Sequence, residues 1–354
     1  MKLLQPGLGP LDGDHYLPAD PSRVHWGLLP NATAEPLLTV RSGKTVTFDT
    51  ISHEGILEDQ GRDPAAFFGA AGIARNSLLH DAVELAASPR EHMPEIHGPH
   101  VVTGPVAVHG AQPGDVLEVE VLALRRRAPY GVISNRHGKG ALPDEYPQTP
   151  PGEPASMVAT VGDDGRGRLP VGDGRQLGFA LRPFLGIMGV APATESPVHS
   201  VPPGPHGGNL DVRHLGTGAR LFLPVQVPEG LFYVGDPHFS QGDGEVALTA
   251  FEAPLRATLR LTVHSDPATR SLAARLRAPF AETAVDHIVL GLDHNLDEAL
   301  RNAVRDALTL LTDRFGIPGP VGLAYLSAAA DFHVSQVVDI VKGVHGRMPK
   351  ADLP

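Results

Sequence analysis

Two polar segments on either side of one apolar run organise this chain: residues 202–214 read PPGPHGGNLDVRH, and residues 235–245 read GDPHFSQGDGE. Between them, apolar residues occupy every second position, at Leu221, Leu223, Val225 and Val227. This period of two predicts a β-strand with one buried face. We expect the two segments to form loops at its ends, and they carry seven side chains suited to metal binding or proton transfer: His206, Asp211, His214, Asp236, His238, Asp243 and Glu245.

Alternating apolar residues predict further strands through roughly the first 265 residues, because side chains of a strand point to its two faces in turn. These strands cover residues 116–124, 184–190, 245–251 and 256–264. Two more, at 35–42 and 44–51, are joined by Ser42-Gly43, which suits a hairpin turn. Residues 56–97 predict irregular chain with short helices, and residues 128–178 predict a long loop with short strands.

The pattern changes near the C-terminus, where apolar residues of 297–315 follow helical spacing. Asn295 suits the helix N-cap, with Glu298 reaching back to it, and a shorter helix is expected at 321–330. We therefore expect a mainly β protein, with a β-sandwich or β-barrel core and a smaller α+β C-terminal part. Residues 1–270 would form a β-rich catalytic core carrying the His/Asp/Glu site, and residues 271–354 an α+β unit packed on it.

Composition excludes several classes of protein. The 354 residues have a net charge of −11, with 29 Lys+Arg against 40 Asp+Glu, which argues against a nucleic-acid partner. The absence of cysteine excludes disulfides, thiolate metal sites and a cysteine nucleophile. No segment resembles a secretory signal or approaches the ~18 apolar residues of a membrane span, so we expect a cytoplasmic protein without a membrane partner.

Histidine and carboxylate side chains without cysteine suit a divalent metal, with Zn²⁺ expected and Ca²⁺ or Mn²⁺ as alternatives. Asp236 and His238 would leave an extended segment on the same face. His206 and Asp211 lie in a glycine-rich loop that can bend towards a metal. These four are the candidate ligands, with His100 of the His97-Gly98-Pro99-His100 loop as a further one.

Glu245 follows a Gly-Asp-Gly turn and is the candidate catalytic base, since a carboxylate there can deprotonate water at the metal. Asp243 is a candidate for supporting the catalytic group or for a second metal site. His214 is expected to be structural or exposed. Isolated histidines such as His53 and His109 are expected to be ordinary core or surface residues.

Two other interpretations remain open at this point. A serine mechanism would depend on Ser240 beside His238, although no Gly-x-Ser-x-Gly motif is present. A non-catalytic β-sandwich could instead hold Ca²⁺ through the acidic loop at 241–245, but Ca²⁺ prefers oxygen ligands and the histidines fit that interpretation poorly.

The two central segments resemble the motifs of the acetamidase/formamidase family. Residues 202–211 match its Pro-Pro-x-x-His-Gly-Gly-Asn-x-Asp pattern, and residues 234–245 match Val-Gly-Asp-x-His-x-x-Gln-Gly-Asp-Gly-Glu. Three shorter stretches agree, around residues 103–115, 186–192 and 335–339, so the resemblance spans about residues 40–350. The chain departs from the family at residues 53–56, where HEGI replaces a version that contains Gly-Gln.

The resemblance implies a β-rich fold and hydrolysis of short linear amides, such as acetamide or formamide, to carboxylate and ammonia. It also implies a divalent metal in some members. Backbone N–H groups of Gly207 and Gly208 would stabilise the oxyanion. The alternatives are a larger or cyclic amide, or an ester, on the same scaffold. We expect a small-molecule substrate and a homo-oligomer, a dimer or larger, because exposed sheet edges and the 56–97 insertion offer contact surfaces.

Overall fold

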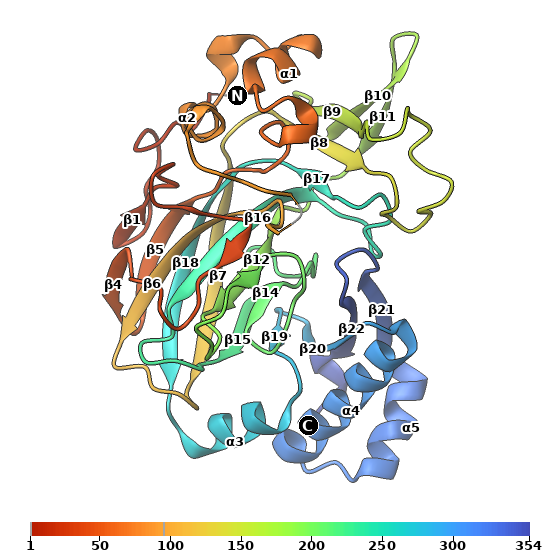
Figure 1. The fold of residues 1–354 in the computed structure, drawn as a ribbon. Helices are drawn as coiled ribbons and strands as arrows, with labels where there is room; N and C mark the ends of the chain where they lie inside the picture. The colour runs from red at the N-terminus through yellow and green to blue at the C-terminus, as the bar shows by residue number, and fades with distance from the viewer. Residues whose placement is uncertain (1, 95) are drawn as a thin grey trace.

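Two large β-sheets face each other in the computed structural model, which describes residues 2–94 and 96–354 (Figure 1). Within the described residues, the first sheet has nine strands, in the order β1 (His15–Leu17), β5 (Lys44–Asp49), β18 (Leu255–His264), β7 (Val116–Arg126), β15 (Arg220–Pro224), β19 (Phe280–Glu282), β20 (Asp286–Asp293), β22 (Lys342–Pro349) and β21 (Asp331–Gln336).

The second sheet follows the order β11 (Arg175–Phe179), β10 (Gly167–Gly172), β9 (Ala155–Val161), β8 (Tyr130–Asn135), β17 (Phe251–Glu252), β16 (Phe232–Ser240), β12 (Phe184–Val190) and β14 (Gly207–Asn209). Beside β16 also lies β6 (Val101–His109), which pairs with β2 (His25–Trp26) and β4 (Leu38–Arg41). A small separate sheet joins β3 (Leu28–Leu29) to β13 (Val198–His199).

The apolar faces of the two sheets form one core. Phe48 of β5 meets Phe232 of β16 edge to face, with ring centroids 5.9 Å apart, so the two sheets are in direct contact. The same cluster contains Val46 and Leu259 from the first sheet and Leu185 from the second, all fully buried or nearly so. The expected mainly β fold with a β-sandwich core is confirmed, because alternating strands bury one apolar face each against the facing sheet.

Helices lie outside the sandwich (Figure 1). They are α1 (Pro64–Ala70), α2 (His80–Ala87), α3 (Pro267–Arg275), α4 (Leu296–Phe315) and α5 (Gly319–Ala329), with short 3₁₀ turns at Glu58–Gln60, Arg75–Ser77 and Lys350–Asp352. None of the helices in the described ranges is both long enough and apolar enough to cross a bilayer.

The C-terminal helix pair forms where the sequence predicted it. The side chain of Asn295 caps α4 by accepting from the backbone N–H groups of Asp297 and Glu298. Glu298 does not reach back as expected, because its carboxylate pairs with Arg301 one turn along the helix. The strands of this region, β19 to β22, continue the first sheet, and α4 packs across β20 and β22 (Figure 1).

Two expectations about strands were wrong. β4 and β5 do not form a hairpin: β4 pairs in parallel with β6, while β5 is buried between β1 and β18 in the other sheet. Residues 245–250 bend instead of extending, and both Glu245 and Leu248 have positive φ. Residues 128–178, where a long loop with short strands was expected, do contain short strands, β8 to β11, and the exposure of β10 and β11 leaves little apolar alternation to detect there.

Buried ion pairs tie segments distant in sequence to the sandwich. Asp49 on β5 binds Arg256 on β18 through two contacts of 2.6 and 2.9 Å, and it also accepts from the hydroxyl of Tyr16 at 2.7 Å. Glu282 on β19 accepts from Lys350 at 2.8 Å and contacts Arg314 of α4. Both carboxylates are buried, and a buried charge without a partner is strongly destabilising, so the cationic partners are needed to keep these acids ionised inside the protein.

Candidate active site

Strand β16 carries two of the predicted side chains, Asp236 and His238, and nearly all of the strand is buried. Asp236 Oδ2 lies 2.9 Å from His238 Nε2. The register of β16 with β12 pairs Leu185 with Pro237 and Ile187 with Gly235, so Asp236 lies opposite Gly186. The i, i+2 spacing therefore places both side chains on one face, as the sequence predicted.

Gly186 makes room for this arrangement. A Cβ atom there would lie 2.3 Å from Asp236 Oδ2, 2.5 Å from Asp211 Oδ1 and 2.9 Å from His238 Cε1. Three carboxylate-bearing residues of the site, Asp211, Asp236 and Glu245, have φ near +50° (49°, 49° and 47°). Such a left-handed conformation is strained for residues other than glycine and is concentrated at functional sites.

His53, His100 and Asp236 form the first of two subclusters. Asp236 Oδ1 lies 3.5 Å from His53 Nδ1 and 3.8 Å from His100 Nε2, and all three side chains are buried. The two imidazole rings meet edge to face at 5.1 Å. Two ligands of a tetrahedral Zn²⁺ with bonds of about 2.1 Å lie about 3.4 Å apart, so this spacing suits one metal ion.

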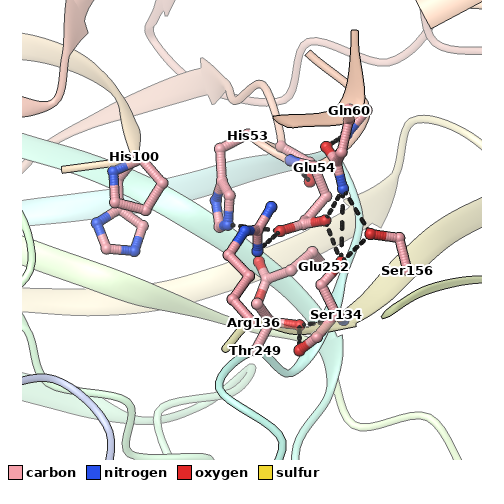
Figure 2. Close-up of polar contacts among 12 residues, drawn as sticks. His53, Glu54, Gln60, His100, Ser134, Arg136, Ser156, Thr249 and Glu252 are labelled. Carbon is pink, nitrogen blue, oxygen red and sulfur yellow. Dashed lines mark hydrogen bonds and ion pairs between the residues drawn. The ribbon is translucent and has the colours of Figure 1, made fainter. Parts of the chain in front are cut away.

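Neighbouring groups fix the orientation of both histidines. His100 Nδ1 lies 3.0 Å from Ser200 Oγ, which leaves Nε2 turned towards Asp236. Figure 2 shows His53 between His100 and Glu54, and His53 Nε2 lies 3.5 Å from Glu54 Oε1. A carboxylate behind a ligand histidine fixes its tautomer and raises its basicity, which is a common arrangement in metal centres.

Glu54 is itself held by a polar network (Figure 2). Its carboxylate accepts from Arg136 at 2.7 Å and from Gln60 and Ser134, while Gln60 also donates to Ser156 at 3.0 Å. Burial alone would raise the pKa of Glu54, but Arg136 and His53 hold it well below its usual range. Glu54 therefore remains a carboxylate. Burial would lower the pKa of His53, but Asp236 and Glu54 together raise it to about 10.

The second subcluster contains buried acids. Burial and the charge of Asp236 raise the pKa of Asp211 to about 6 and that of Glu252 to about 7. Burial, with Asp211 as the nearest charge, also raises the pKa values of Glu245 and Asp339 well above their usual range. His238 lies among them, 3.0 Å from Glu252 Oε1 and 3.8 Å from Asp211 Oδ1. The raised pKa values of Asp211 and Glu252 lie close to neutral pH, so these two side chains suit proton transfer there.

Unpaired atoms indicate that the cluster suits a cation. His53 Nδ1, Asp236 Oδ1, Asp211 Oδ1 and His238 Nδ1 are buried without a hydrogen-bond partner. A buried polar atom without a partner costs about 1–3 kcal/mol, so several together require an explanation. A divalent metal satisfies lone pairs on nitrogen and oxygen and offsets the repulsion among the acids.

The structure brings together five of the predicted site residues: His100, Asp211, Asp236, His238 and Glu245. His206 does not join them. It is buried beside Gly204 and Gly208, its Nε2 has no partner, and it belongs to none of the potential metal groups among the described residues. Asp243 also lies elsewhere, in a group with His214 and His345. Gly207 donates its N–H to Gly204 O at 2.9 Å, so that amide is not free for an oxyanion.

Sequence reasoning missed three members of the site: His53, Glu252 and Asp339. His53 was treated as an ordinary histidine, although the departure from the family pattern at residues 53–56 marked its position. Glu252 is a single acid within the apolar run Ala250-Phe251-Glu252-Ala253, which is a detectable sign of a buried functional carboxylate. Asp339 lies in one of the shorter family-like stretches.

A cavity of about 600 Å³ opens onto both subclusters. His53, His100, Asp236 and Glu245 line its inner part, and residues further out include the charged side chains of Arg136, Lys139 and Lys342. The cavity gives a small molecule direct access to the candidate metal ligands and to the acids with raised pKa values.

Comparisons with known proteins identify the family. A family model described as the acetamidase/formamidase family matches residues 87–200 and 193–350. A formamidase from Methylophilus methylotrophus is 26% identical over 300 residues, covering 68% of this chain and 74% of that protein. An acetamidase from Mycolicibacterium smegmatis is 27% identical over 198 residues, covering 42% of this chain and 49% of that protein.

The fold is also similar to a solved structure of an acetamidase from Yersinia enterocolitica. The TM-score is 0.76 at 23% sequence identity, and the similarity covers 100% of this chain and 96% of the other. At this identity the likeness supports the fold and not the chemistry.

Proposed function

Because the chain belongs to the acetamidase/formamidase family, and so is an amidohydrolase of carbon–nitrogen bonds other than peptide bonds, we propose that it hydrolyses a primary amide at a metal centre around Asp236. The products are a carboxylate and ammonia. One observation carries the proposal. Asp236 Oδ1 lies 3.5 Å from His53 Nδ1 and 3.8 Å from His100 Nε2, and all three residues line the cavity.

His53, His100 and Asp236 would hold the metal, with Zn²⁺ favoured because its preferred ligands are imidazole nitrogen and carboxylate oxygen. When bound, such an ion acts as a Lewis acid that polarises a carbonyl group and lowers the pKa of water. His238 contacts Asp236 Oδ2 and leaves Oδ1 directed at the two histidines. We therefore propose that His238 positions Asp236. Asp211 belongs to the second subcluster, among the buried acids.

Glu245 would carry the proton. Water gives its hydroxyl oxygen to the amide carbon, one proton passes to Glu245, and Glu245 passes a proton to the amide nitrogen as the C–N bond breaks. The leaving nitrogen must be protonated, because an amide anion is too poor a leaving group. Burial and the charge of Asp211 raise the pKa of Glu245 well above its usual range, so this side chain takes up a proton more readily than an ordinary glutamate and can pass it to the leaving nitrogen.

The names of the relatives favour a short amide as substrate, such as formamide or acetamide. The cavity favours a second candidate, a larger amide. Its volume of about 600 Å³ lies in the range of about 300–1,000 Å³ that holds drug-sized ligands. A water molecule takes about 30 Å³ of liquid volume, so a four-atom amide would fill only a small part of this space.

The metal proposal is tested by elemental analysis together with ammonia release. Purified protein should contain a divalent metal, and His100→Ala should lose it from the central site along with activity. His109→Ala is the matched control, because His109 is exposed and does not line the cavity. Full activity of a metal-free preparation would refute the proposal.

The substrate is tested by a panel of primary amides that increases in acyl size from formamide, with ammonia as the readout. Glu245→Gln should abolish release from every active substrate while the protein stays folded. A variant that retains its rate would remove Glu245 from the mechanism. If kcat/KM rises along the series, the larger-amide candidate holds; if it falls from formamide or acetamide onwards, the short-amide candidate holds.

A further inference from the structure

A second cluster of potential metal ligands lies outside the cavity. His214, Asp243 and His345 each place a ligand atom within 4.8 Å of the others. His333 on β21 lies beside them, directly across from His345 on β22 in the strand register, and the two rings stack at 5.5 Å. We call these four residues the outer histidine cluster. Neither Asp243 nor any of the three histidines lines the cavity of the central site.

Each histidine of the outer histidine cluster has one ring nitrogen without a hydrogen-bond partner. In the part of the chain that the structure describes, Nε2 of His214, His333 and His345 is buried without a hydrogen bond. His345 is the clearest case because its side chain is fully buried. Its Nδ1 lies 2.9 Å from Ser335 Oγ, and its Nε2 points to Asp243 Oδ1 at 4.0 Å.

This arrangement repeats the features of a metal centre. One ring nitrogen of His345 is fixed by a hydroxyl while the other faces a carboxylate, as in histidine ligands with outer-shell partners. His214 and His345 approach with ring centroids 5.1 Å apart, close enough to share an ion. Arg213 binds Asp243 Oδ2 at 2.8 Å, and this oxygen also lies 3.6 Å from His333 Nδ1, while Oδ1 faces His345. Arg347 and Asp286 are the other charges that act on His214.

We propose that His214, Asp243 and His345, with His333 at the edge, form a second site for a divalent transition metal such as Zn²⁺. Imidazole-rich sites select Zn²⁺ and its neighbours over Ca²⁺ or Mg²⁺, which prefer oxygen. The proposal assigns Asp243 to this site and gives His214 a role as a ligand.

The position of the second site suggests what it does. Asp243 lies two residues before Glu245, and the intervening Gly244 pairs through its backbone with Ser335 and Val337. A metal here would fasten the loop that carries Glu245 to strands β21 and β22, which come from the far end of the chain. We therefore infer a structural site that positions the catalytic loop, with no direct part in the chemistry.

The test counts metal ions in the full-length protein by titration with Co²⁺, whose visible absorption reports nitrogen and oxygen ligands. The double variant His53→Gln/His100→Gln removes the central site and should still bind one equivalent. Adding His214→Gln should remove that equivalent, and adding His109→Gln instead should leave it. Circular dichroism checks that each variant is folded. His214 is only partly buried, so its replacement is safer than that of His345.

The outcomes separate this site from the central one. If the double variant binds no Co²⁺ at a tenfold excess of metal, the second site does not exist. If wild type and the double variant both bind one equivalent, the second site stands and the central metal proposal fails. A further readout is the melting temperature of the double variant, which Zn²⁺ should raise, and which it should not raise once His214→Gln is added.

Discussion

Substitution of Gly186 by alanine tests whether the site depends on close packing at one point of β12. The added Cβ would lie 2.3 Å from Asp236 Oδ2 and 2.5 Å from Asp211 Oδ1, whereas real Cβ contacts essentially never fall below 3.0 Å. The Asp236 side chain would therefore have to move by about 0.7 Å, which would disturb its contacts with His53 and His100. Displacements of about 1 Å in an active site can cost about 100-fold in rate, or about 2.7 kcal/mol of barrier.

We expect Gly186→Ala to lower kcat/KM for the best amide by about 100-fold and to weaken metal binding at the central site. The backbone of Gly186 is not in the left-handed region, so alanine adds no conformational strain of its own. The control is Gly242→Ala, since a Cβ at Gly242 meets nothing within 4 Å. Ammonia release and metal content would be measured for both. A Gly186→Ala variant with a near-normal rate and full metal content would refute the proposed crowding.

Three further changes test other parts of the structure. Glu54→Gln removes the carboxylate behind His53 and should weaken metal binding about 10- to 100-fold, measured by competition with a chelator; unchanged affinity would exclude Glu54 as an orienting group. Asp49→Asn leaves Arg256 buried without its partner and should cost about 3–5 kcal/mol in the free energy of unfolding by urea, and a loss near zero would contradict the account. Burial would raise the pKa of Glu282, but a histidine, a lysine and an arginine hold it well below its usual range. The ionised Glu282 carboxylate therefore stabilises the fold above the pKa of about 4.3 that it has in the unfolded chain, and this stabilisation is lost as pH falls below that value. Glu282→Gln should make the free energy of unfolding fall less steeply between about pH 5 and 3. An equally steep fall in the variant would contradict this.

Many of the strands could be predicted because apolar and polar residues alternate along them in the sequence. The strands at Val116–Arg126, Phe184–Val190 and Leu255–His264 were expected within two residues of their observed ends, since each buries one face against the sandwich core. The pairing of strands was harder to predict. β4 and β5 are adjacent in sequence but belong to different sheets, and that choice depends on partners far along the chain.

The site was predicted where residue types cluster in sequence and missed where the fold brings distant residues together. Asp236, His238 and Glu245 lie within ten residues of one another, so their density was visible. His53, Glu252 and Asp339 come from three separate segments, and nothing in the sequence places these segments next to one another. His206 is the opposite case: a motif histidine suggested a ligand, yet among the described residues it belongs to none of the potential metal groups.

The central claim is that a metal held by His53, His100 and Asp236 is required for amide hydrolysis. Its most direct test is a titration of metal-free protein with Zn²⁺ while ammonia release from an active amide is followed. The account predicts a rate at background without metal, a rise to a plateau as Zn²⁺ is added, and no recovery in the His53→Gln/His100→Gln variant. A metal-free protein that already hydrolyses the amide at the full rate would contradict it.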